Sequence, residues 1–367
     1  MFLKAYDMFF KGLNIFEIDR AFFDDFSYHS QAEQKKINYR TKQILKWVYS
    51  KYEDNPELFT DLSKLLRSEV NKRFNFRSLD LVDYQFSKIS NSIKFAFKTL
   101  DNEIVESVLM KHPGRYTLCV SSQVGCNVGC IFCASGMFGL KRNLETHEIV
   151  DQLFQVQKFI FEKEGKRISN IVFMGMGEPL VNYKNVLKSI EIFTSDWGFN
   201  ISKRNITLST SGILPRIYNL VEDGVRVKLA LSLHSPFQHE REKLIPIAKK
   251  YAIDQLLKAV EYYYLNTKRR ITIEYILIKD VNDSINHAKE LVNLFKNYNM
   301  KVWVNLIPYN SIGNIYFEEK LLEEPKIERI KTFENIIKDY FEVSVRWSLG
   351  RDIDGACGQL RRRIISN

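Results

Sequence analysis

The sequence predicts an α/β protein whose main part is a partial (βα)6 barrel, with a small N-terminal helical domain and a C-terminal loop that carries a cysteine. From about residue 115, strand-like segments alternate with amphipathic helical segments, which is typical of a parallel sheet covered by helices. Residues 1–90 lack this alternation and instead show basic helical patterns. We therefore expect a helical accessory domain over 1–90, a β-rich linker over 91–114, the barrel over 115–349 and a C-terminal segment over 350–367.

The elements of the barrel follow from periodicity and composition. Segments rich in Val, Ile, Leu or Thr predict six strands at Tyr116–Val120, Asn170–Met174, Asn205–Ser209, Val227–Leu233, Ile271–Ile278 and Val302–Ile307. Helical periodicity lies between them, at Thr146–Glu162, Asn185–Phe193, Ile253–Asn266 and Asn286–Asn297. Before the barrel, Tyr39–Tyr49 and Phe59–Phe74 predict amphipathic helices, and Phe95–Met110 predicts β structure. In such barrels, functional groups gather where the strands end.

The amino-acid composition narrows the classes of function that this protein could have. The chain has 367 residues, of which 45% are hydrophobic and 27% are charged, as in an ordinary globular protein. No apolar run reaches the length that a membrane span needs, and Lys4, Asp7 and Lys11 interrupt any signal-peptide core, so we expect a cytoplasmic protein without a membrane partner. The net charge of +10 fits nucleic-acid binding and a merely solvated basic surface equally well.

Four of the five cysteines lie within fifteen residues, as Cys119-Val-Ser-Ser-Gln-Val-Gly-Cys126-Asn-Val-Gly-Cys130-Ile-Phe-Cys133. The last three form a C-x₃-C-x₂-C pattern, without the second C-x₂-C pair of a typical structural zinc site. Three thiolates on one loop suit a [4Fe–4S] cluster with one iron open to an external ligand, such as the amine and carboxylate of S-adenosylmethionine. A zinc site completed by Cys119 or Cys357, or three unrelated buried cysteines, are the alternatives.

Small polar groups follow several predicted strands. They occur in Gly175-Met176-Gly177-Glu178-Pro179, Ser209-Thr210-Ser211-Gly212, Ser232-Leu233-His234 and Ile307-Pro308-Tyr309-Asn310. Each could be only a tight turn or a helix cap, but together they suit the ribose, adenine and carboxylate of an adenosyl ligand. Cys357 lies farther on, in Asp352-Ile353-Asp354-Gly355-Ala356-Cys357-Gly358-Gln359-Leu360. Its small neighbours favour a reactive thiol over an inert buried one.

These motifs together closely resemble those of the RlmN/Cfr family, the radical-SAM methyltransferases that modify adenine in ribosomal RNA. The resemblance runs nearly end to end and includes CVSSQVGCNVGCIFC, KRNL, GMGEPL, STSGI, SLHSP, IPYN and DIDGACGQL. It implies that Cys126, Cys130 and Cys133 ligate the cluster. It also implies S-adenosylmethionine-binding roles for Gly177, Glu178, Ser209, Ser232, Leu233, His234 and Asn310, and catalytic roles for Glu106, Cys357 and Cys119.

The resemblance also implies a mechanism that consumes two S-adenosylmethionine molecules per turnover. One methylates Cys357, and a second is cleaved reductively to a radical that takes a hydrogen atom from that methyl group. The methylene radical adds to the adenine ring, Glu106 accepts the ring proton, and Cys119 attacks Cys357 to release the product as a disulfide forms. The expected partners are 23S rRNA, tRNA, a reducing electron donor and a disulfide reductant.

Two branches of the family differ in the ring carbon that they methylate. The RlmN branch methylates C2 of adenine 2503 in 23S rRNA and of adenine 37 in some tRNAs, whereas the Cfr branch methylates C8 of the same rRNA base. Val124, Pro179 and Ser211 are similar to the RlmN branch, and Ser235 is more similar to Cfr. We expect C2 methylation, with C8 methylation or a non-enzymatic zinc-stabilised RNA-binding protein as alternatives.

Overall fold

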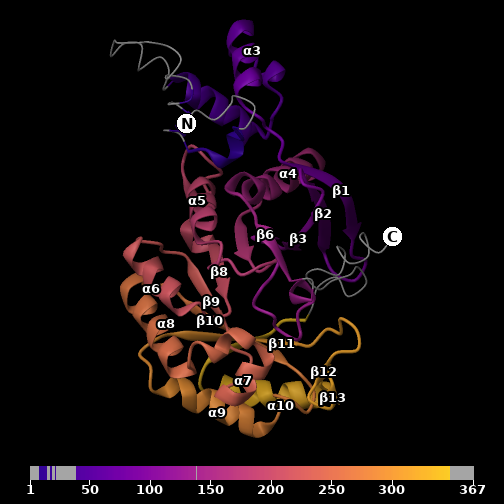
Figure 1. Cartoon of the computed structure of the whole chain (residues 1–367), viewed down its shortest axis with the longest axis vertical. Helices are drawn as coiled ribbons and strands as arrows, with labels where there is room; N and C mark the ends of the chain where they lie inside the picture. Colours follow the sequence, from indigo (N-terminus) through magenta and orange to yellow (C-terminus); the bar gives the residue numbers. More distant parts are fainter. Residues whose placement is uncertain (1–7, 15–16, 19–20, 22–38, 138, 348–367) are drawn as a thin grey trace.

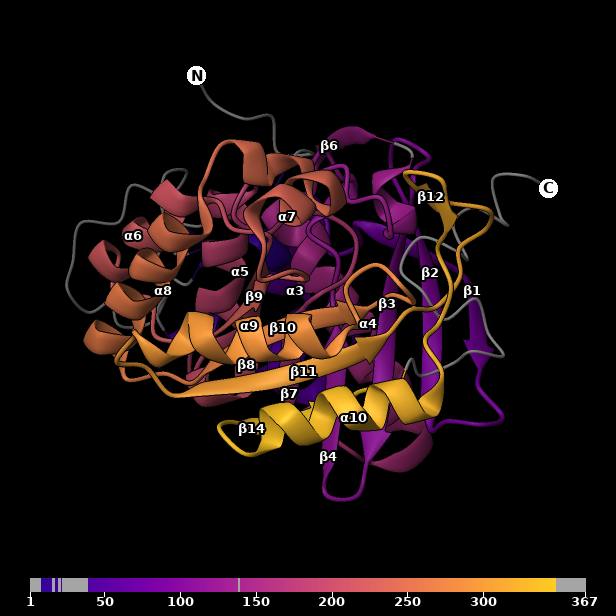
Figure 2. The same cartoon turned by 90° about the horizontal axis from the view of Figure 1, so that it is seen from below.

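The computed structural model describes residues 8–14, 17–18, 21, 39–137 and 139–347. The centre of the fold is a ten-stranded sheet whose strand order is β1-β2-β3-β4-β7-β8-β9-β10-β11-β14 (Figures 1 and 2). Cys357 and the rest of the expected C-terminal segment lie outside the described residues. None of the helices in the described ranges is long and apolar enough to cross a membrane.

Within this sheet, β4 and the strands that follow it in the strand order are parallel, and they confirm the predicted barrel. Six of them coincide with the predicted strands: β4 (Arg115–Cys119), β7 (Asn170–Phe173), β8 (Ile206–Thr210), β9 (Lys228–Ser232), β10 (Ile271–Leu277) and β11 (Val302–Pro308). A seventh strand, β14 (Glu342–Val345), pairs with β11. Every residue of β10 is buried, because helices cover one face and the barrel interior covers the other.

Helices cover the outer face of the barrel strands. They are α4 (Thr146–Glu164), α5 (Tyr183–Thr194), α6 (Leu214–Glu222), α8 (Ile253–Thr267), α9 (Ile285–Lys296) and α10 (Ile327–Lys338). The short helix α7 (Gln238–Leu244) lies instead in the connection after β9, near the ends of β8 and β9. In Figure 2, α9 and α10 lie alongside β10 and β11. The helix α4 ends at Gly165, whose positive φ of 61° suits glycine. The four predicted helical segments correspond to α4, α5, α8 and α9.

The region before β4 differs from a simple helical domain and linker. Strands β1 (Leu79–Phe86), β2 (Ser92–Thr99) and β3 (Ile104–His112) form an antiparallel meander that joins the edge of the barrel sheet at β4. Within the range expected to be helical, Leu79–Phe86 is therefore a strand. Along this strand half-buried and exposed residues alternate, and Tyr84, one of the exposed side chains, packs edge-on against Phe159 of α4.

The N-terminal region that precedes these strands contains short helical pieces. Helix α3 (Lys64–Arg73) begins at Ser63, whose hydroxyl accepts a hydrogen bond from the Leu66 amide. A π-helical turn spans Lys46–Ser50 within the predicted Tyr39–Tyr49 helix. This region lies at one end of the molecule, next to α4 (Figure 1). The buried Lys11 side chain connects it to the barrel through an ion pair of 2.6 Å with Asp151 of α4.

Candidate active site

A cavity of about 350 Å³ lies where the parallel strands end, and most of the predicted site residues line it. Its walls include the predicted residues Cys119, Cys126, Cys130, Cys133, Gly177, Glu178, Ser209, Ser232 and His234. These residues come from the ends of β4, β7, β8 and β9 and from the cysteine loop, segments far apart in the sequence. The expectation that functional groups gather where the strands end therefore places these residues around one cavity.

The cysteine loop is held at its base by a two-stranded hairpin. Strand β5 (Gln123–Gly125) pairs with β6 (Leu140–Asn143), and the three predicted ligands lie in the connection between them. Gly125 has a φ of +80°, and a Cβ there would lie 1.9 Å from the Gly139 carbonyl oxygen. The Cys126 amide donates to that carbonyl at 3.0 Å. Only glycine permits this approach of the two ends of the loop.

The electrostatic environment of the loop favours neutral thiols when no metal is bound. Burial raises the pKa of Cys126 to about 12, and burial raises the pKa of Cys130 as well. Neighbouring cysteines and Glu178 add to both shifts, while Arg241 opposes the shift at Cys130. A coordinating cation removes the thiol proton outright, so iron ions would compensate for the burial of these three sulfurs.

The arrangement of the loop differs from that of a single-ion zinc site. Among the described residues, no three Cys, His, Asp or Glu side chains are grouped closely enough to hold one metal ion. A four-iron cluster places each sulfur ligand on a different iron, and so it needs three thiols that line one space without converging on a point. Cys126, Cys130 and Cys133 meet that condition in the cavity, and the residues present fit the cluster.

Glu178 is fixed by hydrogen bonds at the end of β7. One carboxylate oxygen accepts from the amide and the hydroxyl of Ser211 at 2.7 and 2.8 Å, and the other accepts from the Leu180 amide at 3.1 Å. Burial raises the pKa of Glu178, and the Ser211 bonds act in the opposite direction. A buried carboxylate with fixed orientation suits an ammonium or hydroxyl group of a ligand. Ser211, from the STSG motif, is a supporting residue whose role the sequence did not indicate.

Gly177 has a φ of +103°, and a Cβ there would lie 2.6 to 2.8 Å from atoms of Gln123. We predict that Gly177→Ala weakens S-adenosylmethionine binding about tenfold, because strain of about 1–3 kcal/mol displaces the turn that carries Glu178. Isothermal titration calorimetry measures this effect. Gly165→Ala is the matched control, since Gly165 also has a positive φ but has nothing within 4 Å of the added Cβ. Equal binding by both variants would contradict the prediction.

His234 is buried in the cavity wall as a neutral imidazole. Its Nδ1 accepts a hydrogen bond from the Ile276 amide at 3.0 Å, which leaves the proton on Nε2. Burial and the nearby Arg241 lower the pKa of His234 to about 3. The imidazole ring packs edge-on against Phe132, which lies between Cys130 and Cys133 in the sequence. His234 can therefore act as a hydrogen-bond donor to a ligand beside the loop.

Arg241 of α7 is a site residue that the sequence did not reveal. It is 1% exposed, and its Nη2 donates to the carbonyl oxygens of Ser211 and Ser232 at 2.6 and 3.3 Å. Burial lowers the pKa of Arg241 to about 10, while Cys130 raises it. This guanidinium joins the ends of β8 and β9 and places a positive charge near the cysteine loop. Nothing in its local sequence, REKL, distinguishes it from a surface arginine.

Glu106 lies on β3, in the strand next to Cys119. Val108 pairs with Cys119 across β3 and β4, and Glu106 shares the face of β3 that carries the cavity residues Val108 and Met110. Glu106 itself does not line the cavity. Its carboxylate is 3% exposed and forms an ion pair of 2.9 Å with Lys94 of β2, which is 1% exposed. The sequence did not indicate Lys94, because the pair forms across two strands.

The remaining predicted residues lie apart from the cavity surface. Leu233 is fully buried and donates its amide to the Glu274 carbonyl, and Asn310 is half-buried beyond β11. Neither side chain is part of the cavity lining, so any contact with a ligand would come from the backbone or from a rearrangement. Cys357 lies outside the described residues.

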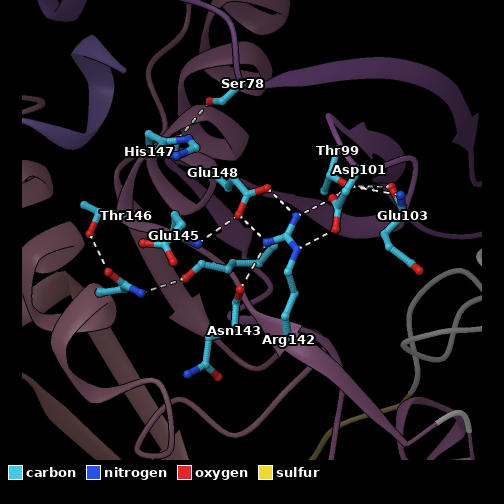
Figure 3. Close-up of polar contacts among 12 residues, drawn as sticks. Ser78, Thr99, Asp101, Glu103, Arg142, Asn143, Glu145, Thr146, His147 and Glu148 are labelled. Atoms are coloured by element: carbon cyan, nitrogen blue, oxygen red, sulfur yellow. Dashed lines mark hydrogen bonds and ion pairs between the residues drawn. The ribbon is translucent and has the colours of Figure 1, made fainter. Parts of the chain in front are cut away.

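A network centred on Arg142 of β6 anchors the base of the cysteine loop (Figure 3). Its guanidinium forms two-pronged hydrogen bonds of 2.6 to 2.8 Å with Asp101, in the β2–β3 turn, and with Glu148, in the first turn of α4. Hydrogen bonding to Arg142 lowers the pKa of Asp101. Because the folded pKa is depressed, the stabilisation is present at neutral pH and is lost as the pH falls.

We predict that Arg142→Gln lowers the free energy of unfolding by about 1–3 kcal/mol, because it leaves the buried Glu148 without its charged partner. Urea denaturation measures this change. Arg77→Gln is the control, because its ion pair with Asp80 is exposed on both sides and is expected to contribute less than about 1 kcal/mol. Equal effects of the two substitutions would show that the Arg142 network contributes no more than a surface pair.

Comparisons with known proteins agree with this site. Residues 120–306 match the model of the radical SAM superfamily, and residues 13–75 match that of the ribosomal RNA large subunit methyltransferase N-terminal domain. A Dictyoglomus thermophilum protein named "Probable dual-specificity RNA methyltransferase RlmN" is 47% identical over 325 residues, which cover 88% of this chain and 90% of the relative. A Thermotoga maritima protein of the same name is 46% identical over 330 residues, which cover 90% and 93%.

A solved structure supports the same assignment. The crystal structure of a radical SAM methyltransferase from Sphaerobacter thermophilus is 38% identical, with a TM-score of 0.86, and the match covers 96% of this chain and 98% of that one. Sequence and fold thus agree over nearly the whole length. The chain belongs to the RlmN family of S-adenosylmethionine-dependent radical-SAM methyltransferases, and this membership implies a [4Fe–4S] cluster and S-adenosylmethionine as cofactors.

Proposed function

We propose that this protein methylates C2 of adenine 2503 in 23S rRNA and C2 of adenine 37 in tRNAs, through a methyl group carried on Cys357. The observation that carries the proposal is that Cys119, a cysteine outside the C-x₃-C-x₂-C loop, opens into the same cavity as the three loop cysteines. A cluster needs only the three loop sulfurs, so the fourth is available for a separate step. Resolution of a covalent protein–RNA adduct is such a step.

The chemistry of the adenine ring requires a different role for each of Cys357, Glu106 and Cys119. C2 is too weakly nucleophilic to take a methyl group from a sulfonium directly, and so Cys357 receives the methyl group first. After the carbon of that group bonds to C2, the adduct would return one electron to the cluster, and Glu106 accepts the C2 proton. The Cys119 thiolate then attacks the Cys357 sulfur, and the carbon–sulfur bond breaks with its electron pair on the ring-bound carbon. That carbon takes up a proton to become the methyl group, and a disulfide remains. An external disulfide reductant restores the two thiols.

The cofactor sites use the residues at the strand ends. The cluster on Cys126, Cys130 and Cys133, with a reducing electron donor, would supply the radical chemistry that activates the methyl group. S-adenosylmethionine would be held by Gly177, Glu178, Ser209, Ser232, Leu233, His234 and Asn310. Glu178 offers a fixed carboxylate, and His234 offers an Nε2–H donor.

The N-terminal region supplies a candidate surface for RNA. Several lysines and arginines of residues 1–90 are exposed, among them Arg40, Lys46, Lys64 and Lys72. Such charges release counterions from a phosphate backbone and so favour RNA binding without sequence selectivity. The target adenine must leave its stack to reach a recessed cavity, as base-modifying enzymes generally require. We assign this region an accessory role in RNA binding.

The rival target is C8 of the same rRNA adenine. The residue that resembles the C8 branch is Ser235, and its hydroxyl donates to Glu240 at 2.6 Å and does not line the cavity. Ser211, which resembles the C2 branch, orients Glu178 in the cavity wall. The residues nearest to the ligand space therefore favour C2.

The test is anaerobic incubation of cluster-reconstituted protein with S-adenosylmethionine, a reductant, and either a 23S rRNA fragment or tRNA. Mass spectrometry of the digested RNA against nucleoside standards separates 2-methyladenosine from 8-methyladenosine. We expect 2-methyladenosine with both substrates. Formation of 8-methyladenosine would refute the C2 assignment, and an unmodified tRNA would restrict the activity to rRNA.

A further inference from the structure

A second cavity, of about 450 Å³, lies at the opposite end of the barrel from the cysteine loop. Its lining includes the N-terminal ends of β4 and β9, the residues just before β8 and β10, and the end of β3. The two cavities share Met110, Met174, Glu274, Arg346 and Trp347. The second cavity is therefore the other half of the barrel interior, and the proposed methyl transfer gives it no role.

Four cations from separate strands face this cavity: Arg115, Lys228, Arg270 and Arg346. Within the described part of the chain, none of them forms an ion pair with a carboxylate. Arg270 lies over the Trp303 ring, and Arg346 donates to the sulfurs of Met174 and Met110. The four cations outnumber the one carboxyl group that the described residues contribute to the cavity lining, that of Glu274. Burial raises the pKa of Glu274, and Arg346 and Arg270 lower it, so a net positive potential remains in the cavity.

The titratable neighbours respond to this potential. The pKa of Lys228 is lowered by burial and then by Arg270, Arg115 and Arg269. The pKa of His112 is lowered by burial and then by Arg115 and Arg346. Both groups are thus disfavoured in their charged forms first by burial and second by the neighbouring positive charge. An anion in the cavity would offset the second effect.

The inner end of the cavity offers a different kind of group. Glu274 is 4% exposed, and its Oε1 accepts from the Asn305 amide at 3.0 Å. Its Oε2 has no hydrogen-bond partner among the described residues. A buried carboxylate oxygen without a donor is costly, so a ligand that brought a hydroxyl or amino group to it would gain binding energy. The lining also includes neutral polar residues, namely Thr117, Asn170, Asn205, Thr207, Thr272 and Ser344.

We propose that this cavity binds a nucleoside mono- or diphosphate, with the phosphate at Arg115, Lys228 and Arg270 and a hydroxyl or amino group at Glu274. Guanidinium groups match phosphate oxygens in two-pronged geometry, and a lysine adds a point charge. The cavity volume is within the range of small-molecule sites. A simple inorganic anion would leave the oxygen of Glu274 without a donor. Arg115 and Arg270 are exposed, so contact with an RNA chain is the competing outcome that the experiment has to distinguish.

Calorimetric titration of the reconstituted protein with AMP, ADP, inorganic phosphate or adenosine tests the proposal. S-adenosylmethionine is present throughout, so that the cofactor site is saturated. We expect AMP and ADP to bind more tightly than phosphate or adenosine. Arg270→Glu and Lys228→Glu should each weaken nucleotide binding at least tenfold. Glu274→Gln should weaken AMP binding severalfold and leave phosphate binding unchanged.

Lys301→Glu is the matched control, because Lys301 is exposed at the same end of the sheet, just before β11, and does not line the cavity. It should bind AMP as the wild type does. If Lys228→Glu fails to fold, Arg270→Glu still tests the cation site, because Arg270 is exposed and its substitution is expected to leave the fold intact. A second readout is the NMR titration of His112, whose pKa should rise when AMP is bound.

Three results would overturn the proposal. The first is an absence of saturable AMP or ADP binding, and the second is binding that Arg270→Glu leaves unchanged, which would place the nucleotide elsewhere. The third is a loss in Arg270→Glu of affinity for an RNA oligonucleotide alone, which would make the cations part of an RNA surface. None of these results bears on the identity of the methylated carbon, so this proposal and the proposed function fail independently.

Discussion

Protein carrying Cys130→Ala is expected to contain no stable iron–sulfur cluster after anaerobic reconstitution and to transfer no methyl group. Cys130 lies in the middle of the three-cysteine loop and shares its cavity with Cys126 and Cys133. With one of the three thiolates removed, only two protein sulfurs hold the cluster. Burial, which raises the pKa of Cys126, still disfavours the Cys126 thiolate, and the weakened iron binding offsets less of that cost. Iron, acid-labile sulfide and visible absorption measure the loss directly.

Cys119→Ala is the matched control for this experiment. Cys119 is buried and lines the same cavity, so its replacement removes a thiol from the cavity wall without touching the proposed cluster ligands. It should keep iron and sulfide at the wild-type level. Retention of a full cluster by Cys130→Ala, or equal loss from both variants, would contradict the assignment of the three loop cysteines as the ligands.

Cys357→Ala is expected to abolish RNA methylation while the protein still cleaves S-adenosylmethionine reductively. The cleavage depends on the cluster and the strand-end residues, which this substitution leaves intact, whereas the methyl group loses its carrier. Chromatography with mass spectrometry quantifies 5′-deoxyadenosine and methylated nucleosides in the same reaction. Methylated RNA from this variant would refute the two-cysteine mechanism.

Cys119→Ala gives the complementary result in the same assay. Carbon transfer to the adenine proceeds, but no thiol is available to attack Cys357, so RNA stays covalently attached to the protein. A denaturing gel with labelled RNA detects that adduct. Free methylated RNA in wild-type yield from this variant would remove Cys119 from the mechanism without disturbing the role of Cys357.

The barrel and the cofactor motifs could be predicted because each depends on residues that are close together in the sequence. Parallel strands buried on both faces have apolar sequences, and each polar motif follows its strand directly, so position along the chain gives position in the fold. The confirmed alternation from β4 to β11 is of this kind. The polar motifs that line the cavity were found by this reasoning, the three loop cysteines by their spacing, and the individual residue roles by the family resemblance.

Features that depend on contacts between distant segments could not be predicted in this way. The sequence showed β structure near Phe95–Met110 but not that it extends the barrel sheet, because strand pairing is decided by partners elsewhere. Arg241 and Lys94 are charged residues in unremarkable surroundings, and only the fold buries them beside Cys130 and Glu106. The basic cavity is likewise assembled from strand ends that are far apart in the sequence.

Val108 of β3 pairs with Cys119 of β4, and this pairing fixes the register of the two strands. The backbone ladder sets the offset between Glu106 and Cys119 on these adjacent strands. Ser107, one position farther along β3, points the other way and donates to Gln152 on α4. Insertion of a single amino acid between Glu106 and Val108 would therefore turn the carboxylate to the opposite face of β3 and leave the thiol in place, which would separate the two groups that we propose for proton removal and disulfide formation.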